Sequence, residues 1–147
     1  MSRPIDELSG WLKTFQVTNL LTLFFLPITV IYFVFLYSYN KTTIPLAIIL
    51  VLIGELGVYW FITYKILKCI KLRSEDVPNM ISKLLLSLVI VSDGFLAIKH
   101  LIDLDLTMNS VKVLVSEVLY FFGWAMYFEK SKRVKAYYGA NTKLSFL

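Results

Sequence analysis

Four long runs of apolar residues, separated by short polar segments, dominate this chain. The runs occupy residues 17–37, 44–66, 80–102 and 111–128. A helix needs about 20 predominantly apolar residues to cross the hydrocarbon core of a bilayer. The pattern therefore predicts an all-α integral membrane protein with four transmembrane helices in one domain, residues 1–147.

The segments between the runs are short and rich in polar residues and proline. Residues 40–43 form a polar turn before Pro45, and residues 73–79 and 103–110 make the other two connections. Connections of this length place consecutive helices antiparallel, so we expect an up-down-up-down bundle. Pro27 lies inside the first run and predicts a kink there.

The distribution of charge supports a membrane location. The chain is 58% apolar and 17% charged, with a net charge of +5, whereas a soluble domain is about half apolar and about a quarter charged. The positive residues flank the apolar runs, which favours an anionic membrane surface over nucleic acid as their partner. The one cysteine, Cys69, excludes an intramolecular disulfide framework and a cysteine-based metal site. We expect it to be a reduced structural thiol, with palmitoylation as the alternative.

Lysine and arginine are distributed very unevenly between the two sides of the membrane. The predicted spans leave Lys41, Lys99 and Lys112 on one side. The other twelve lie on the opposite side, namely Arg3, Lys13, Lys65, Lys68, Lys71, Arg73, Lys83, Lys130, Lys132, Arg133, Lys135 and Lys143. Because the more positive side is normally cytoplasmic, both termini are predicted to be cytoplasmic.

The segments outside the spans look like surface helices. In residues 1–16 apolar side chains recur at helical spacing, so we expect a short interfacial helix anchored by Trp11. The alternative is that this segment begins the first span. Residues 129–147 form a basic tail with a helical start, which Gly139 is able to end. The tail is either a positive anchor or a contact for anionic lipid or a partner, made by Trp11, Lys130, Lys132, Arg133 and Lys135.

A motif near the C-terminus combines aromatic, hydroxyl and basic residues, namely Trp124, Tyr127, Phe128, Ser131, Arg133, Val134 and Lys135. It resembles the signature of the DUF2569 family of small bacterial membrane proteins, although Tyr137 and Tyr138 depart from the usual Thr-Phe. The opening Gly10-Trp11-Leu12, Pro27 and Val77-Pro78 are also similar to the family pattern. This resemblance implies four transmembrane helices in a bacterial inner membrane. It brings no established activity and no catalytic residue.

Three carboxylates fall within the predicted spans: Glu55, Asp93 and Glu117. From their positions along the spans, they lie within ~4.5 Å of one depth, where no lysine or arginine accompanies them. We expect intramembrane carboxylates to face the bundle interior. They are either a shared proton or cation site, or protonated groups that hydrogen-bond between helices. His100, the only histidine, is either an interfacial residue or a relay to Asp93.

One face of the last run carries side chains with hydrogen-bonding groups. At 100° per residue, Tyr120, Trp124, Tyr127 and Ser131 follow Glu117 down this face. We expect this stripe to pack inward and stabilise the bundle. The alternative is that it lines a path or a ligand groove.

The sequence contains no Gly-rich phosphate loop, no paired histidine metal motif and no supported Ser/His/Asp arrangement. We therefore expect no enzyme activity, no cofactor and no metal. The favoured function is that of a structural, regulatory or accessory membrane protein, which associates with itself or with a larger membrane complex. The alternative is a small proton- or cation-coupled transporter or channel-like oligomer that uses the buried carboxylates.

Overall fold

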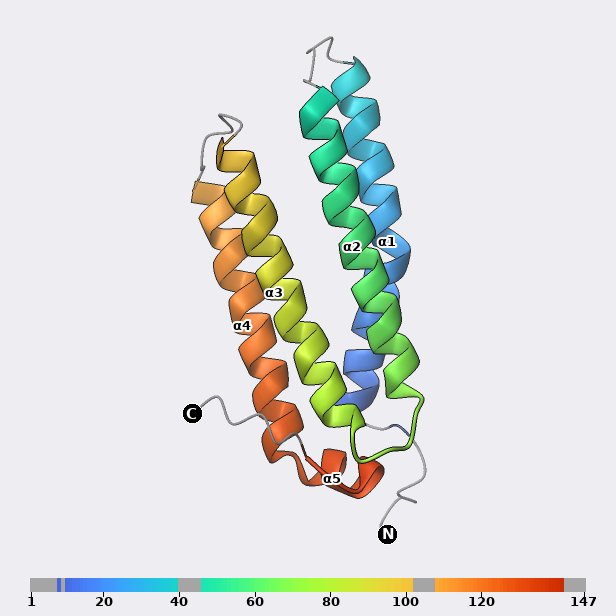
Figure 1. Ribbon diagram of the computed structural model, residues 1–147. Helices are drawn as coiled ribbons and strands as arrows, with labels where there is room; N and C mark the ends of the chain where they lie inside the picture. Colours follow the sequence, from blue (N-terminus) through green and yellow to red (C-terminus); the bar gives the residue numbers. More distant parts are fainter. Residues whose placement is uncertain (1–7, 9, 40–45, 102–107, 142–147) are drawn as a thin grey trace.

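The computed structural model is all-α, and it describes residues 8, 10–39, 46–101 and 108–141 (Figure 1). Four long helices are followed by one short helix. In chain order they are α1 (Trp11–Tyr39), α2 (Leu46–Ile70), α3 (Val77–Leu101), α4 (Met108–Lys130) and α5 (Lys132–Tyr138).

Successive long helices run in opposite directions (Figure 1). They form two antiparallel pairs, α1 with α2 and α3 with α4, and the pairs pack against each other mainly through α2 and α3. Figure 1 shows the two pairs close together at the α5 end and further apart at the opposite end. The bundle therefore has a tight half and an open half.

The tight half contains the core. The fully buried side chains include Phe15 of α1, Ile66 of α2, Ile81 of α3 and Phe128 of α4, each 0% exposed. Val134 of α5 is also 0% exposed, so the short helix belongs to the same core. Among the described side chains, none of α1 beyond Asn19 and none of α2 before Ile62 is buried. The other half of the bundle therefore presents its side chains to its surroundings.

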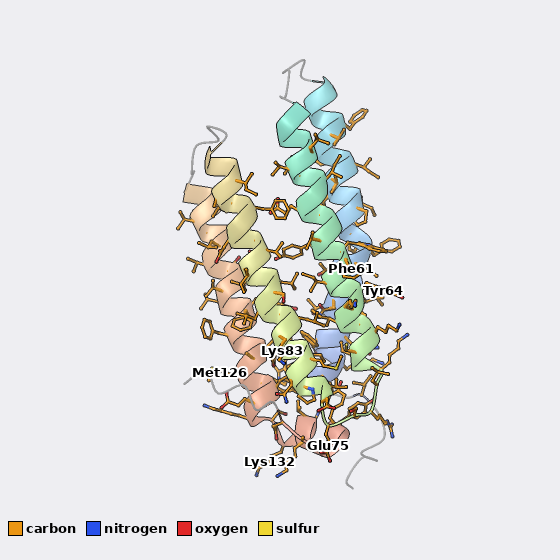
Figure 2. The ribbon with its side chains drawn as sticks, viewed as in Figure 1. Phe61, Tyr64, Glu75, Lys83, Met126 and Lys132 are labelled. Carbon is orange, nitrogen blue, oxygen red and sulfur yellow. The ribbon has the colours of Figure 1, made fainter. Side chains whose placement is uncertain are left out.

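The outer surface of the helices is apolar. Figure 2 shows Phe61 and Tyr64 on α2 and Met126 on α4, which are 53%, 46% and 45% exposed. A water-soluble monomer seldom exposes apolar patches of this extent. Within the described residues, three helices are long and apolar enough to cross a membrane, over the segments Trp11–Tyr32, Leu50–Ile70 and Val77–Ile98. The length and composition of these segments support a membrane location.

The start of α1 differs from the expected interfacial helix. Trp11 and Phe15 belong to α1 itself, which continues without interruption through Pro27 to Tyr39. From Trp11 onward, the N-terminal segment is therefore part of the same helix as the first apolar run, which favours the alternative that it begins the first span. Residues 1–7 lie outside the described residues. Trp11 is 67% exposed, because it starts the helix at the rim of the bundle.

The basic tail is not a simple continuation of α4, because the chain turns at Ser131 into a separate helix. The Ser131 hydroxyl accepts hydrogen bonds from the backbone N–H groups of Arg133 and Val134, which caps α5. The Asn141 side-chain amide donates to the carbonyl oxygens of Phe128 and Ser131, both at 3.0 Å. Gly139 ends α5 in the left-handed conformation, with φ +86°, as the sequence predicted.

Tyr138 joins α5 to α2. Its hydroxyl donates a 3.2 Å hydrogen bond to the carbonyl oxygen of Ile70, the last residue of α2. Burial raises the pKa of the Tyr138 phenol, so the group stays protonated and remains a donor at neutral pH.

The Tyr138→Phe variant should be about 1 kcal/mol less stable than the wild type, because it removes this hydrogen bond and leaves the ring in place. Reversible unfolding in mixed detergent micelles would measure the change. Tyr137→Phe is the matched control, because the Tyr137 ring contacts Arg73 through its face and should do so without the hydroxyl. An unchanged stability of Tyr138→Phe would show that the hydrogen bond is absent.

Candidate ligand-binding cavity

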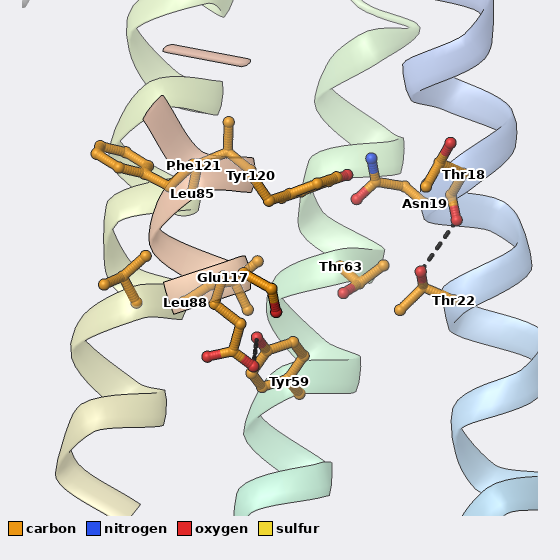
Figure 3. Close-up of a pocket in the computed structure, with 12 residues that line it drawn as sticks. Thr18, Asn19, Thr22, Tyr59, Thr63, Leu85, Leu88, Glu117, Tyr120 and Phe121 are labelled. Carbon is orange, nitrogen blue, oxygen red and sulfur yellow. Dashed lines mark hydrogen bonds between the residues drawn. The ribbon is translucent and has the colours of Figure 1, made fainter. Parts of the chain in front are cut away.

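A cavity of about 340 Å³ lies among the four long helices, above the tight core (Figure 3). Its walls come from all four. The lining residues are Thr18, Asn19, Thr22, Tyr59, Thr63, Leu85, Leu88, Val89, Ser116, Glu117, Tyr120 and Phe121. Cavities that hold small molecules measure about 300–1,000 Å³, so this one is large enough for a small ligand.

The cavity lies near the middle of the long helices. Thr22 is three residues from the midpoint of α1, Tyr59 is one residue from that of α2, and Val89 is at that of α3. Because the midpoint of a spanning helix lies near the centre of the bilayer, the cavity would lie at that depth in a membrane.

Glu117 of α4 provides the one carboxylate among the lining residues. The Tyr59 hydroxyl of α2 donates a hydrogen bond of 3.0 Å to its Oε1 (Figure 3). Its other oxygen, Oε2, is buried and has no hydrogen-bond partner within the described part of the chain. A buried carboxylate oxygen is stable only when a donor or a cation satisfies it. Glu117 therefore lines the cavity and has one buried oxygen that accepts no hydrogen bond from the described residues.

The wall formed by α1 presents further acceptors. The Thr18 and Thr22 hydroxyls donate to the carbonyl oxygens of Thr14 and Thr18, at 2.9 and 3.0 Å. The Asn19 side-chain nitrogen donates to the carbonyl oxygen of Phe15 at 2.8 Å. Each side chain thus uses a donor within its own helix. The Asn19 side chain also interacts with the Tyr120 hydroxyl, whereas the Thr18 and Thr22 oxygens keep lone pairs that can accept.

The opposite wall is apolar and aromatic. Leu85, Leu88 and Val89 of α3 and Phe121 of α4 supply it. The Tyr120 ring crosses the cavity towards Asn19 (Figure 3). One side of the cavity therefore offers oxygen atoms and the other offers hydrocarbon.

The three predicted intramembrane carboxylates do not meet. Glu117 lines the cavity, but Glu55 and Asp93 do not. Among the described residues, no group of three His, Cys, Asp or Glu side chains is close enough to hold a metal. Asp93 is exposed on α3, and Glu55 is half-buried one turn from Tyr59. Of the two alternatives for these carboxylates, a site shared by all three does not form, because only Glu117 lines the cavity. Glu117 accepts a hydrogen bond from another helix, as the second alternative expects.

The reason is the face of each helix and not the depth. Glu55, Asp93 and Glu117 lie three, four and two residues from the midpoints of α2, α3 and α4, which is at most ~6 Å at 1.5 Å per residue. Asp93 is nevertheless exposed, and Tyr59, one turn from Glu55, lines the cavity where Glu55 does not. The side chain of His100 lies outside the described residues, so a relay from it to Asp93 stays a prediction.

The stripe on α4 packs inward, as expected for most of its length. The Trp124 ring lies 4.5 Å from that of Phe15, centroid to centroid, and 5.6 Å from that of Tyr127. Ser131 ends the stripe as the cap of α5. Tyr120, like Glu117 one turn before it, follows the alternative that we considered, because both line the cavity.

The predicted lipid or partner contacts divide into two kinds. The side chains of Trp11, Lys130, Lys132 and Lys135 are exposed at the α5 end, where Figure 2 shows Lys132. Arg133 is also exposed, but its guanidinium lies directly against Gly10. Gly10 has φ +61°, and a Cβ built there would overlap Nη1 of Arg133. Arg133 therefore packs on its own chain at the start of α1.

The neutral polar residues of the cavity were not expected from the sequence. Thr18, Asn19 and Thr22 share one face of α1, inside an apolar run. Polar residues that recur at one and four positions within such a run are a signal that could have been used. Thr63 and Ser116 are isolated and carry no comparable signal.

No family model matches this chain, no curated protein matches its sequence, and no solved structure matches its fold. The resemblance to the DUF2569 family therefore stays a prediction.

Proposed function

We propose that this protein crosses the bacterial inner membrane four times, with both termini in the cytoplasm. Two observations support a crossing by α4. It runs beside α3, and its residues Ser116 to Phe121 line the cavity at the level of the midpoints of the other three helices. The excess of lysine and arginine at the α5 end supports the orientation.

The proposed activity is non-enzymatic binding of a small cation in the membrane-embedded cavity, with Glu117 as its counter-charge. The observation that carries this proposal is the buried Oε2 of Glu117, which has no hydrogen-bond partner among the described residues. None of the lining residues is lysine, arginine or histidine, so the lining itself brings no positive charge to this carboxylate. The acceptor oxygens of Thr18, Asn19 and Thr22 also favour a positively charged ligand.

A cation at this site has a physical advantage that an anion or a neutral molecule lacks. Away from water, an ionised carboxylate is unfavourable unless it is paired or protonated. A proton or a cation neutralises it, and the two therefore compete for the same oxygen. Such competition is the elementary requirement of proton-coupled cation transport, which extends the proposal to a transporter built on one carboxylate.

The second candidate is the accessory protein that the sequence favoured. One observation supports it. α5 buries Val134 and Tyr138 in the core while Lys132 and Lys135 remain exposed on its other side. This basic surface suits an anionic lipid surface or a membrane partner, including a second copy of the chain. In that case, function depends on these lysines and tolerates changes at Glu117.

Equilibrium binding to the purified protein in lipid nanodiscs tests the proposed activity. The probes are radiolabelled sodium and radiolabelled methylammonium. At least one should bind saturably to the wild type and about tenfold or more weakly to Glu117→Gln, which keeps the shape of the side chain and loses its charge.

Asp93→Asn is the matched control, because it removes an intramembrane carboxylate that is exposed and outside the cavity. It should bind the same probe as tightly as the wild type. If neither probe binds saturably, or if Glu117→Gln binds like the wild type, the proposed activity is wrong. If Glu117→Gln retains binding of the probe and the Lys132→Gln/Lys135→Gln variant loses it, the accessory function is favoured.

A further inference from the structure

The cavity has more room and more hydrocarbon than an inorganic cation needs. One water molecule occupies about 30 Å³ of liquid, so a cavity of about 340 Å³ has the volume of roughly ten waters. Leu85, Leu88 and Val89 form a continuous apolar wall over one turn of α3. A metal ion would leave most of this volume, and this wall, without a partner.

The lining is also a poor set of ligands for a metal ion. Na⁺ and divalent cations take several oxygen ligands, and for Mg²⁺ and Ca²⁺ these commonly include more than one carboxylate. Here the cavity has one carboxylate, and no cluster of three acidic, histidine or cysteine side chains exists in the described part of the chain. The remaining acceptors belong to neutral side chains on α1.

An ammonium group fits the same acceptors well. It carries up to three N–H donors that point in different directions. Oε2 of Glu117 is the acceptor that lacks a partner, and the oxygens of Thr22 and Asn19 lie on the facing helix. The faces of the Tyr59 and Tyr120 rings add a favourable surface for a positive charge.

We propose that the ligand is a primary organic amine in its ammonium form, with an apolar body of several carbon atoms. Its ammonium group binds to Glu117, between α2 and α4, and its body lies against Leu85, Leu88 and Val89 of α3. This inference rests on the proposed cation-binding function and narrows it to one chemical class.

Competition against radiolabelled methylammonium in nanodiscs tests the class of ligand. Phenethylammonium should displace the label at a concentration about tenfold or more below that of unlabelled methylammonium, because its additional carbon atoms are transferred from water to the apolar wall. 2-Phenylethanol has the same body with a hydroxyl in place of the ammonium, and it should not displace the label at that concentration.

A substitution that fills the apolar side of the cavity tests where the body lies. Leu88→Phe should abolish the advantage of phenethylammonium and leave methylammonium bound, which also shows that the variant is folded. Ile90→Phe is the control, because Ile90 is on the same helix and is 61% exposed on the outside. It should behave like the wild type.

The inference is overturned if phenethylammonium displaces the label no better than methylammonium, or if sodium is the stronger competitor. It is also overturned if Leu88→Phe and Ile90→Phe retain the same preference for phenethylammonium. In these cases cation binding at Glu117 stands and only the class of ligand is wrong. The proposed function itself fails in a different way: either neither probe binds saturably, or Glu117→Gln leaves binding unaffected.

Discussion

Replacing Phe15 with alanine should destabilise the bundle by about 3–5 kcal/mol, which is the usual cost of truncating a fully buried phenylalanine. Phe15 is 0% exposed, and its ring centroid lies 4.5 Å from that of Trp124 and 5.3 Å from that of Phe128. These contacts join α1 to α4, at the level where the two helix pairs come together. Within a membrane the loss is mainly one of close packing, because lipid is as apolar as the side chain.

Reversible unfolding in mixed detergent micelles would measure this effect, with the fluorescence of Trp124 as a local signal. Phe24→Ala is the matched control on the same helix, because Phe24 is 69% exposed and its ring packs edge-on against that of the neighbouring Phe25. It should change the free energy of unfolding by less than about 1 kcal/mol. Equal effects of the two substitutions would contradict the assignment of the core to the α5 half.

Replacing Gly10 with alanine should destabilise the protein by about 1–2 kcal/mol. Its φ of +61° lies in the left-handed region, which is unfavourable for a residue with a Cβ. The new methyl group would also overlap the guanidinium of Arg133 and force that side chain to move. The two segments on which the family resemblance rests thus touch each other, and this contact gives both a structural role.

Gly57→Ala provides the comparison within the same chain. Gly57 is inside α2, and a Cβ added there meets nothing within 4 Å. Since alanine has the higher helix propensity, this variant should be as stable as the wild type or more stable by up to ~1 kcal/mol. A destabilisation in Gly57→Ala that matched the one in Gly10→Ala would show that the backbone at Gly10 is not special.

The long helices were predictable because each corresponds to a run of apolar residues that is long enough to span a membrane. The sequence predicted four long helices, and the structure contains them as α1, α2, α3 and α4. The fold of the tail was less accessible. The turn at Ser131 depends on a cap and on the Asn141 side chain, which donates to the end of α4, and neither is visible in hydropathy.

The candidate site was predictable only in part. Glu117 was identified because a carboxylate in an apolar run is conspicuous. Its companions were assigned by depth alone, which does not say which face of the helix carries them. Asp93 is exposed, and Glu55 does not line the cavity, whereas Tyr59, one turn from Glu55, does. Asn19 and Thr22 are neutral and were not predicted from the sequence, yet they line the α1 side of the cavity, opposite Glu117.

The central claim is that a cation binds directly to the Glu117 carboxylate within the bundle. Infrared difference spectroscopy of the protein in lipid, recorded with and without methylammonium, tests it most directly because it detects the carboxyl group itself. We expect a carboxyl difference band in the wild type that disappears in Glu117→Gln and persists in Asp93→Asn. A band that remains in Glu117→Gln, or no band in the wild type, would contradict the account.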